Sequence, residues 1–154
     1  LQAKLSQYRT TAHGINIEIT EGMLLSNLQE AIDTMHSLKA LGFSLSLDDF
    51  GTGYSSLSYL KLFPIDTLKI DRSFINGIHE SQIDESIVRA IITLAKTLSL
   101  KVVAEGVENN RHLEILRQTH CDYFQGYYTS KPLPVSAFEA HLMVNSSQKS
   151  TSVS

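Results

Sequence analysis

The sequence predicts an α/β fold, namely an eight-stranded TIM-like (β/α)8 barrel of which this chain holds about the last five βα units. One observation is that five strand-like segments alternate with helix-like segments between residues 15 and 143, an order typical of parallel βα units. The other is that each strand has an apolar face and a polar residue near its C-terminal end, as in a barrel covered by helices on its outside. A one-layer α+β sheet whose polar residues face solvent is the alternative.

Chain length sets the number of units. Eight βα units take about 250 residues, whereas this chain has 154, so we expect about three further strands on the N-terminal side. Residues 1–14 are too polar and too short to supply them. An incomplete barrel would leave unpaired strand edges, which favour self-association.

The individual elements follow from periodicity. Short segments between turn signals predict strands at residues 15–20, 44–48, 67–71, 101–105 and 123–127, and the first of them is rich in β-branched residues in period-two alternation. Apolar residues at helical spacing predict helices from Ser26 or Asn27 to Gly42, before Pro64, and over residues 82–98, 111–119 and 134–143. The domain is expected to occupy residues 1–144, because the Ser-rich residues 145–154 contain almost no core-forming side chain and predict a disordered tail.

Composition excludes several classes of protein. The net charge of −3 argues against a broad basic surface for polymeric nucleic acid. The apolar runs are shorter than the roughly 20 residues of a membrane span. The single cysteine, Cys121, excludes an internal disulfide and a cysteine-rich zinc site. We therefore expect a cytoplasmic domain in a reducing compartment, with Cys121 as a small buried residue.

Acidic residues mark the C-terminal ends of the predicted strands. Glu18, Asp48, Asp49 and Glu105 would converge at the barrel mouth, with Lys69 as the cation among them. Two carboxylates about 4 Å apart repel by roughly 4 kcal/mol at an effective dielectric of about 20, so either some are protonated or divalent cations bind. Oxygen ligands favour Mg²⁺ or Mn²⁺ over zinc, and a pair of such ions suits phosphoryl chemistry. The alternative is that the two aspartates only cap a turn.

Three interpretations of Lys69 compete. An inward lysine with a lowered pKa is the nucleophile of Schiff-base aldolases, but neighbouring carboxylates hold a lysine protonated. The sequence therefore favours a charged lysine that orients or polarises an attacking water. A structural ion pair with Asp71 or Glu105 is the remaining interpretation.

The segment at residues 48–56 (DDFGTGYSS) lacks the Gly-Lys-Ser/Thr ending of a phosphate loop and the third glycine of a dinucleotide fingerprint. Its two close glycines instead predict a mobile loop over the barrel mouth, which Glu21 could hold by a hydrogen bond. The six histidines form no pair at metal-ligand spacing on one element, so each is expected at the surface or in the core.

Five segments carry a family resemblance. They are residues 18–21 (EITE), 48–56 (DDFGTGYSS), 68–75 (LKIDRSFI), 103–108 (VAEGVE) and 125–127 (QGY). In order and spacing they resemble the EAL-domain family of bacterial cyclic di-GMP phosphodiesterases, over about residues 15–143. The resemblance implies a (β/α) barrel whose first strand runs antiparallel to the others, and hydrolysis of cyclic di-GMP to linear pGpG with Mg²⁺ or Mn²⁺.

The same resemblance implies catalytic and metal-binding roles for the acidic strand ends and the lysine. Glu18, Asp48 and Asp49 would bind metal, with Asp48 as the bridge. Lys69 and Glu105 would contact the nucleophilic water or the metal-bound solvent.

Other matching residues would support the site. Glu108, Gln125 and Asp71 would line the substrate site or surround it, and Glu21 would anchor the loop that begins at Asp48. The resemblance implies that this loop links metal occupancy to activity and to a homodimer interface common in the family.

The chain departs from the family at two ligands. The Glu-Ala-Leu tripeptide is absent, and the nearest strings, which begin at Glu30 and Glu139, lie in predicted helices. The Asn ligand is absent too, and Asn16 cannot replace it because it lies on the wrong strand. We therefore expect the parent protein to be active and this chain alone to be inactive. A non-catalytic cyclic di-GMP-binding module is the alternative. Sensor or diguanylate cyclase modules, which commonly precede such domains in the family, are possible upstream.

Overall fold

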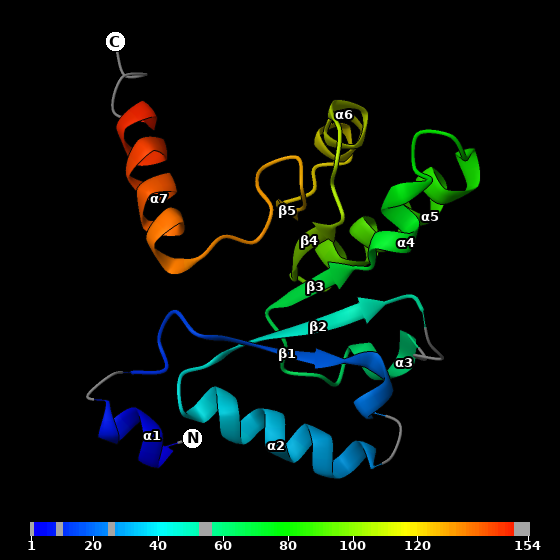
Figure 1. The fold of residues 1–154 in the computed structure, drawn as a ribbon. Helices are drawn as coiled ribbons and strands as arrows, with labels where there is room; N and C mark the ends of the chain where they lie inside the picture. Colours follow the sequence, from blue (N-terminus) through cyan, green and yellow to red (C-terminus); the bar gives the residue numbers. More distant parts are fainter. Residues whose placement is uncertain (1, 9–10, 25–26, 53–56, 150–154) are drawn as a thin grey trace.

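The computed structural model describes residues 2–8, 11–24, 27–52 and 57–149. Its centre is a five-stranded parallel sheet in the order β1-β2-β3-β4-β5 (Figure 1). The strands are β1 (Asn16–Thr20), β2 (Ser44–Phe50), β3 (Thr67–Ile70), β4 (Lys101–Glu105) and β5 (Tyr123–Gln125). The predicted fold class is confirmed. Because consecutive strands are parallel neighbours, all their C-terminal ends lie on one edge of the sheet.

Helices connect and flank the strands. They are α1 (Gln2–Gln7), the 3₁₀ helix η1 (Glu21–Leu24), α2 (Leu28–Ala40), α3 (Leu57–Leu60), α4 (Arg72–Asn76), α5 (Gln82–Thr97), α6 (Asn110–Gln118) and α7 (Val135–Lys149). Polar side chains at the N-caps of four of them accept a backbone N–H, which satisfies a donor that the helix leaves unpaired. These caps are Asn27, Asp71, Ser81 and Asn109. None of the helices in the described ranges is long and apolar enough to cross a membrane.

Several boundaries differ from those predicted. Strand β2 continues to Phe50, and β5 ends at Gln125. Helix α7 continues to Lys149, so residues 145–149, which the sequence assigned to a disordered tail, are helical. The sequence contains no Gly or Pro there to end the helix. Residues 150–154 lie outside the described residues, and α1 and α4 were not predicted.

The core lies between one face of the sheet and the helices. Alternate residues of the three middle strands are fully buried on that face, namely Leu45, Leu47, Leu68, Ile70, Val102 and Ala104. Helix α5 packs on β3 and β4 with its apolar stripe, and α2 packs on β2 (Figure 1). Since side chains alternate between faces, the residues between these core positions point to the opposite face, where the predicted polar residues lie.

Two aspartates brace the N-terminal edge of the sheet in the same way. The Asp66 carboxylate accepts a hydrogen bond from the Leu45 N–H at 2.8 Å and binds Lys39 Nζ at 2.6 Å. The Asp122 carboxylate accepts from the Val102 N–H at 2.9 Å and binds Lys96 Nζ at 2.6 Å. Each aspartate therefore ties the last turn of a helix to the strand after it, at the end of the sheet opposite the acidic residues.

Candidate functional site

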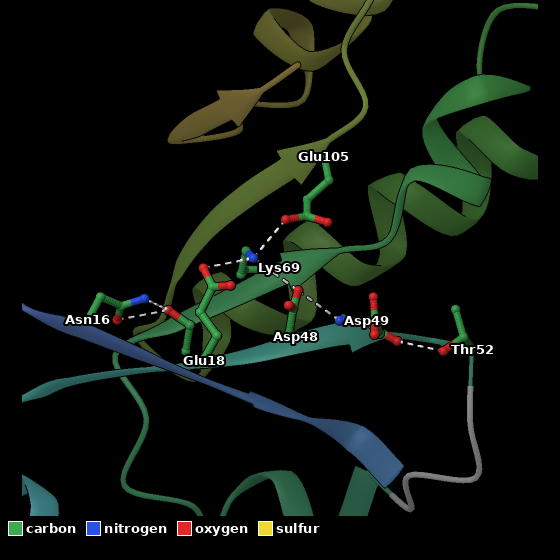
Figure 2. Close-up of polar contacts among 8 residues, drawn as sticks. Asn16, Glu18, Asp48, Asp49, Thr52, Lys69 and Glu105 are labelled. Atoms are coloured by element: carbon green, nitrogen blue, oxygen red, sulfur yellow. Dashed lines mark hydrogen bonds and ion pairs between the residues drawn. The ribbon is translucent and has the colours of Figure 1, made fainter. Parts of the chain in front are cut away.

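The Lys69 side chain lies at the centre of the polar face (Figure 2). Its ammonium is 2.7 Å from Glu105 Oε1, 2.8 Å from Glu18 Oε1 and 3.1 Å from Asp48 Oδ1. These carboxylates come from β4, β1 and β2, on either side of β3. The lysine is only 5% exposed, so the pairing is shielded from solvent on the lysine side. The structure therefore brings together four residues that the sequence predicted would meet.

The charge of Lys69 follows from these contacts. Burial is the largest influence and lowers its pKa, but hydrogen bonds with Glu105, Glu18 and Asp48 together outweigh burial, so the pKa of the ammonium is raised above its ordinary value. Schiff-base chemistry needs a neutral amine, so this environment disfavours the aldolase interpretation.

Asp71 follows β3 but serves the next helix. Its carboxylate accepts a hydrogen bond from the Ser73 N–H at 2.9 Å and caps α4. Partial burial raises the pKa of Asp71, yet its hydrogen bonds with Ser73 outweigh this and lower it. Of the two partners that the sequence proposed for Lys69, Glu105 forms the ion pair.

Asp48 and Asp49 reach the same site because β2 is irregular. The register of β2 against β3 shifts between Leu47 and Phe50, and Asp49 has a φ of 54°, a left-handed conformation that Asp tolerates better than most residues. In a regular strand Asp49 would point into the core after Leu47. The shift instead buries Phe50 there and leaves the Asp49 carboxylate near that of Asp48.

The described residues contain one group that could hold a metal ion. Carboxylate oxygens of Asp48, Asp49 and Glu105 all lie within 4.8 Å of one another. Such a set of oxygen donors fits a hard divalent cation. The turn interpretation holds in part: Asp48 Oδ1 accepts from the Asp49 N–H at 3.0 Å. However, it is the backbone carbonyl of Asp49 that accepts from the Thr52 hydroxyl at 2.8 Å (Figure 2).

A second polar pair lies one step below the site on the same face. Asn16 Nδ2 donates to Ser46 Oγ at 2.7 Å, and the Ser46 hydroxyl donates to Asn16 Oδ1 at 3.0 Å (Figure 2). Each residue precedes a site carboxylate, Glu18 or Asp48, by two positions and so shares its face. This pair was not predicted from the sequence, although the two-residue offset was the available signal.

Glu21 contacts the segment that follows β2. It is 3% exposed, and its Oε2 accepts from the Gly51 N–H at 3.2 Å. Gly51 has a φ of +97°, and a Cβ on it would lie 2.8 Å from the Phe74 ring, so only glycine fits here without strain. Residues 53–56 of the predicted loop lie outside the described residues.

Gln125 and Glu108 stand at the periphery of the site. Gln125 is the register partner of Glu105 across β4 and β5 and is exposed. Glu108 is an exposed residue of the connection after β4. Their predicted contribution to substrate binding remains a prediction.

Comparison with known proteins decides the family, because the model of the EAL domain family matches residues 1–132. The chain belongs to the EAL domain family. The cyclic di-GMP phosphodiesterase NbdA of Pseudomonas aeruginosa is 51% identical to this EAL chain over 138 residues, 90% of this chain and 18% of NbdA. The cyclic di-GMP phosphodiesterase PdeR of Escherichia coli is 43% identical over 125 residues, 81% of this chain and 19% of PdeR. The EAL chain thus spans about a fifth of the length of these relatives.

Solved EAL structures share the fold. The PaMucR phosphodiesterase in complex with c-di-GMP has a TM-score of 0.85 at 39% identity, covering 89% of this chain and 56% of that one. BlrP1 of Klebsiella pneumoniae, in a complex with manganese and c-di-GMP, has a TM-score of 0.78 at 32% identity, covering 84% of this chain and 33% of that one. The five βα units of the EAL chain therefore correspond to part of a larger TIM-barrel-like domain.

Proposed function

We propose that the protein containing this EAL chain hydrolyses cyclic di-GMP to linear pGpG in a reaction that depends on Mg²⁺ or Mn²⁺. The observation that carries the proposal is the convergence of Asp48, Asp49 and Glu105 beside the Lys69 ammonium. Relatives named as cyclic di-GMP phosphodiesterases and an EAL structure with manganese and c-di-GMP support it.

The acidic residues would hold the metal. Asp48, Asp49 and Glu105 offer oxygen atoms close together. Glu18 is about half exposed beside Lys69 and is proposed to add a further ligand. A bound divalent ion would supply Lewis acidity at a phosphoryl oxygen and lower the pKa of a water nucleophile.

The other side chains of the site would orient the reactants. A charged Lys69 balances the surrounding carboxylates with its three N–H donors, and one of these would hold an attacking water when Asp48 or Glu18 serves as a metal ligand instead. Glu105, 2.7 Å from Lys69 Nζ, is proposed to contact the nucleophilic water or the metal-bound solvent. The water oxygen would bond to phosphorus while the bond from phosphorus to the 3′ oxygen breaks, and a proton lost by the water would end on the 3′ oxygen, which leaves as a hydroxyl and opens the ring. Glu108, Gln125 and Asp71 are proposed to surround the nucleotide, and Glu21 to anchor the segment after Asp48.

We also propose that this chain alone is inactive, because it lacks the Glu-Ala-Leu tripeptide; the nearest strings, at Glu30 and Glu139, lie on α2 and α7. The second candidate is a receptor that binds cyclic di-GMP without cleaving it.

Two features bear on partners. In the described sheet β1 and β5 are the outer strands, and such edges support pairing with further strands or a second copy. MucR of Pseudomonas aeruginosa, 44% identical over 118 residues, is named a bifunctional diguanylate cyclase and phosphodiesterase. We therefore propose a homodimer and a sensor or cyclase module upstream.

The test is to assay the full-length protein and the 154-residue chain for pGpG with Mg²⁺. We expect the full-length protein, but not the isolated chain, to turn over cyclic di-GMP. This activity should be lost on chelation of the metal and in the variant Asp48→Ala. The control variant Asp33→Ala on α2 should retain it. Turnover by the isolated chain at the full-length rate would overturn the inactivity proposal. Binding of cyclic di-GMP without any turnover by the full-length protein would favour the receptor.

A further inference from the structure

Two histidines that are 33 residues apart meet outside the acidic site. His79 lies in the turn between α4 and α5, and His112 lies on α6. His112 Nε2 is 3.1 Å from His79 Nδ1, and the ring centroids are 5.0 Å apart. His112 is only 3% exposed. The two residues are 33 positions apart and lie on different elements, so this pair is a product of the tertiary fold.

The neighbouring Asn109 assigns the proton positions. Its Oδ1 accepts from the His112 backbone N–H at 3.0 Å, so its amide nitrogen is the group 3.0 Å from His112 Nε2. An N–H donor there requires a lone pair on Nε2, so a neutral His112 carries its proton on Nδ1. The His79 Nδ1–H then donates to the same Nε2. The 3.5 Å contact from the Glu108 N–H to His112 Nδ1 is the weaker one and is not made in this tautomer.

The surroundings of the pair, burial first, favour a neutral His112. Burial, followed by the nearby His79, lowers the pKa of His112, while Glu108 and the Gly106 backbone act in the opposite direction. His79 Nε2 is 3.4 Å from the Glu80 carboxylate. Arg111 and Glu114 of α6 line a hollow together with His79.

The pair is linked to the acidic site through Gly106. This residue directly follows Glu105 and has a φ of +72°, and a Cβ on it would lie 2.6 Å from the Cβ of Arg72 on α4. The backbone after Glu105 therefore rests directly on α4. Gly106 therefore contacts α4 at its first residue, and the His79–His112 bond ties the turn that follows α4 to α6.

We propose that the His79–His112 hydrogen bond positions Glu105 against Lys69 by holding α4 under Gly106. This role rests on the proposed function. Protonation of His112 Nε2 would set an N–H against the Asn109 N–H, and His79 could accept from it only after moving its own proton from Nδ1 to Nε2, so the arrangement described here is lost in acid. Since the folded-state pKa of His112 is lowered, the bridge contributes fully above the ordinary value of about 6.5 and is lost as the pH falls through the folded value.

The test compares His112→Gln, His79→Ala and the exposed control His36→Gln in the full-length protein. Glutamine can accept the His79 N–H without titrating, so we expect His112→Gln to retain most of kcat and to move the acid limb of kcat by about one pH unit. His79→Ala should lower kcat by about tenfold with little change in KM, because misplaced catalytic groups cost up to about 10²-fold. His36→Gln should match the wild type.

A readout independent of catalysis separates this proposal from the proposed function. In ¹⁵N-histidine-labelled protein, imidazole NMR should show His112 as the Nδ1–H tautomer, and the amides of Gly106 and Glu108 should shift as it titrates. An Nε2–H tautomer, or a wild-type acid limb in His112→Gln, would overturn the bridge. The NMR result could hold in a protein that has no phosphodiesterase activity. The bridge would then stand as a structural link, while its role in positioning Glu105 for catalysis would fail together with the proposed function.

Discussion

Asp48 and Asp49 are adjacent in the chain, yet their carboxylates both approach that of Glu105, with oxygen atoms of all three within 4.8 Å. Adjacent residues of a regular strand point to opposite faces. The left-handed Asp49 and the register shift in β2 remove that alternation. The site therefore depends on a local irregularity that turns a charged residue away from the core position it would otherwise occupy.

Replacement of Asp49 tests this arrangement. Asn tolerates the left-handed backbone, so Asp49→Asn should fold normally while losing one carboxylate. We expect Mn²⁺ affinity and kcat to fall by about 10²-fold, comparable to or larger than the loss of a supporting residue at a metal site. Calorimetric titration with Mn²⁺ and steady-state kinetics measure the two effects. Unchanged Mn²⁺ affinity would remove Asp49 from the ligand set.

Replacement of Lys69 tests the balance of charge. Lys69→Met leaves Glu18, Asp48 and Glu105 without their shared cation, so unfolding free energy should fall by about 2 kcal/mol. This is less than the roughly 3–5 kcal/mol of a fully buried pair, since Glu18 is 48% exposed. Urea unfolding with and without Mn²⁺ checks it, and the ion should restore much of the loss. The exposed Lys61→Met is the matched control, and a Lys69→Met protein as stable as that control would contradict the account.

The contact between Glu21 and Gly51 predicts a loop-specific effect. Glu21→Gln keeps the shape of the side chain but removes its charge, and should destabilise the protein by only about 1 kcal/mol. Hydrogen exchange of the Gly51 amide should accelerate, and kcat should fall because the segment after Asp49 is less restrained. The exposed Glu30→Gln serves as the comparison. Wild-type protection of Gly51 in Glu21→Gln would show that the anchor lies elsewhere.

Asp122 predicts an acid-dependent loss of stability. Partial burial raises its pKa, but bonds with Lys96 and the Val102 N–H outweigh this and lower it. A lowered carboxyl pKa contributes stability above the unfolded value of about 3.9, and this is lost as the pH falls through the folded value.

The measurement is thermal unfolding of Asp122→Asn between pH 3 and pH 7. We expect a deficit of about 1–2 kcal/mol at neutral pH that narrows below about pH 4. The exposed Asp33→Asn on α2 should show neither effect. A deficit that does not change with pH would assign the role of Asp122 to shape rather than charge.

Much of the fold was accessible from local pattern. The strand at residues 101–105 and the helix that begins near residue 82 were predicted closely, because alternation and the 3.6-residue period report which face is buried. Helix α4 was missed because its five residues are too few to show a period. The end of α7 was missed because residues 145–149 are polar, and polarity alone does not end a helix.

The sequence by itself determined the family, the order of the parallel units and the residues whose charges had to be reconciled, since residue type and spacing along the chain are local properties. Only the tertiary structure decided which charges meet. It gave Lys69 three acidic partners, assigned Asp71 to a helix cap, turned Asp49 beside Asp48, and joined His79 to His112. These outcomes depend on strand register, one backbone dihedral and the packing of α4 and α6, and each is set by contacts between residues far apart in the chain.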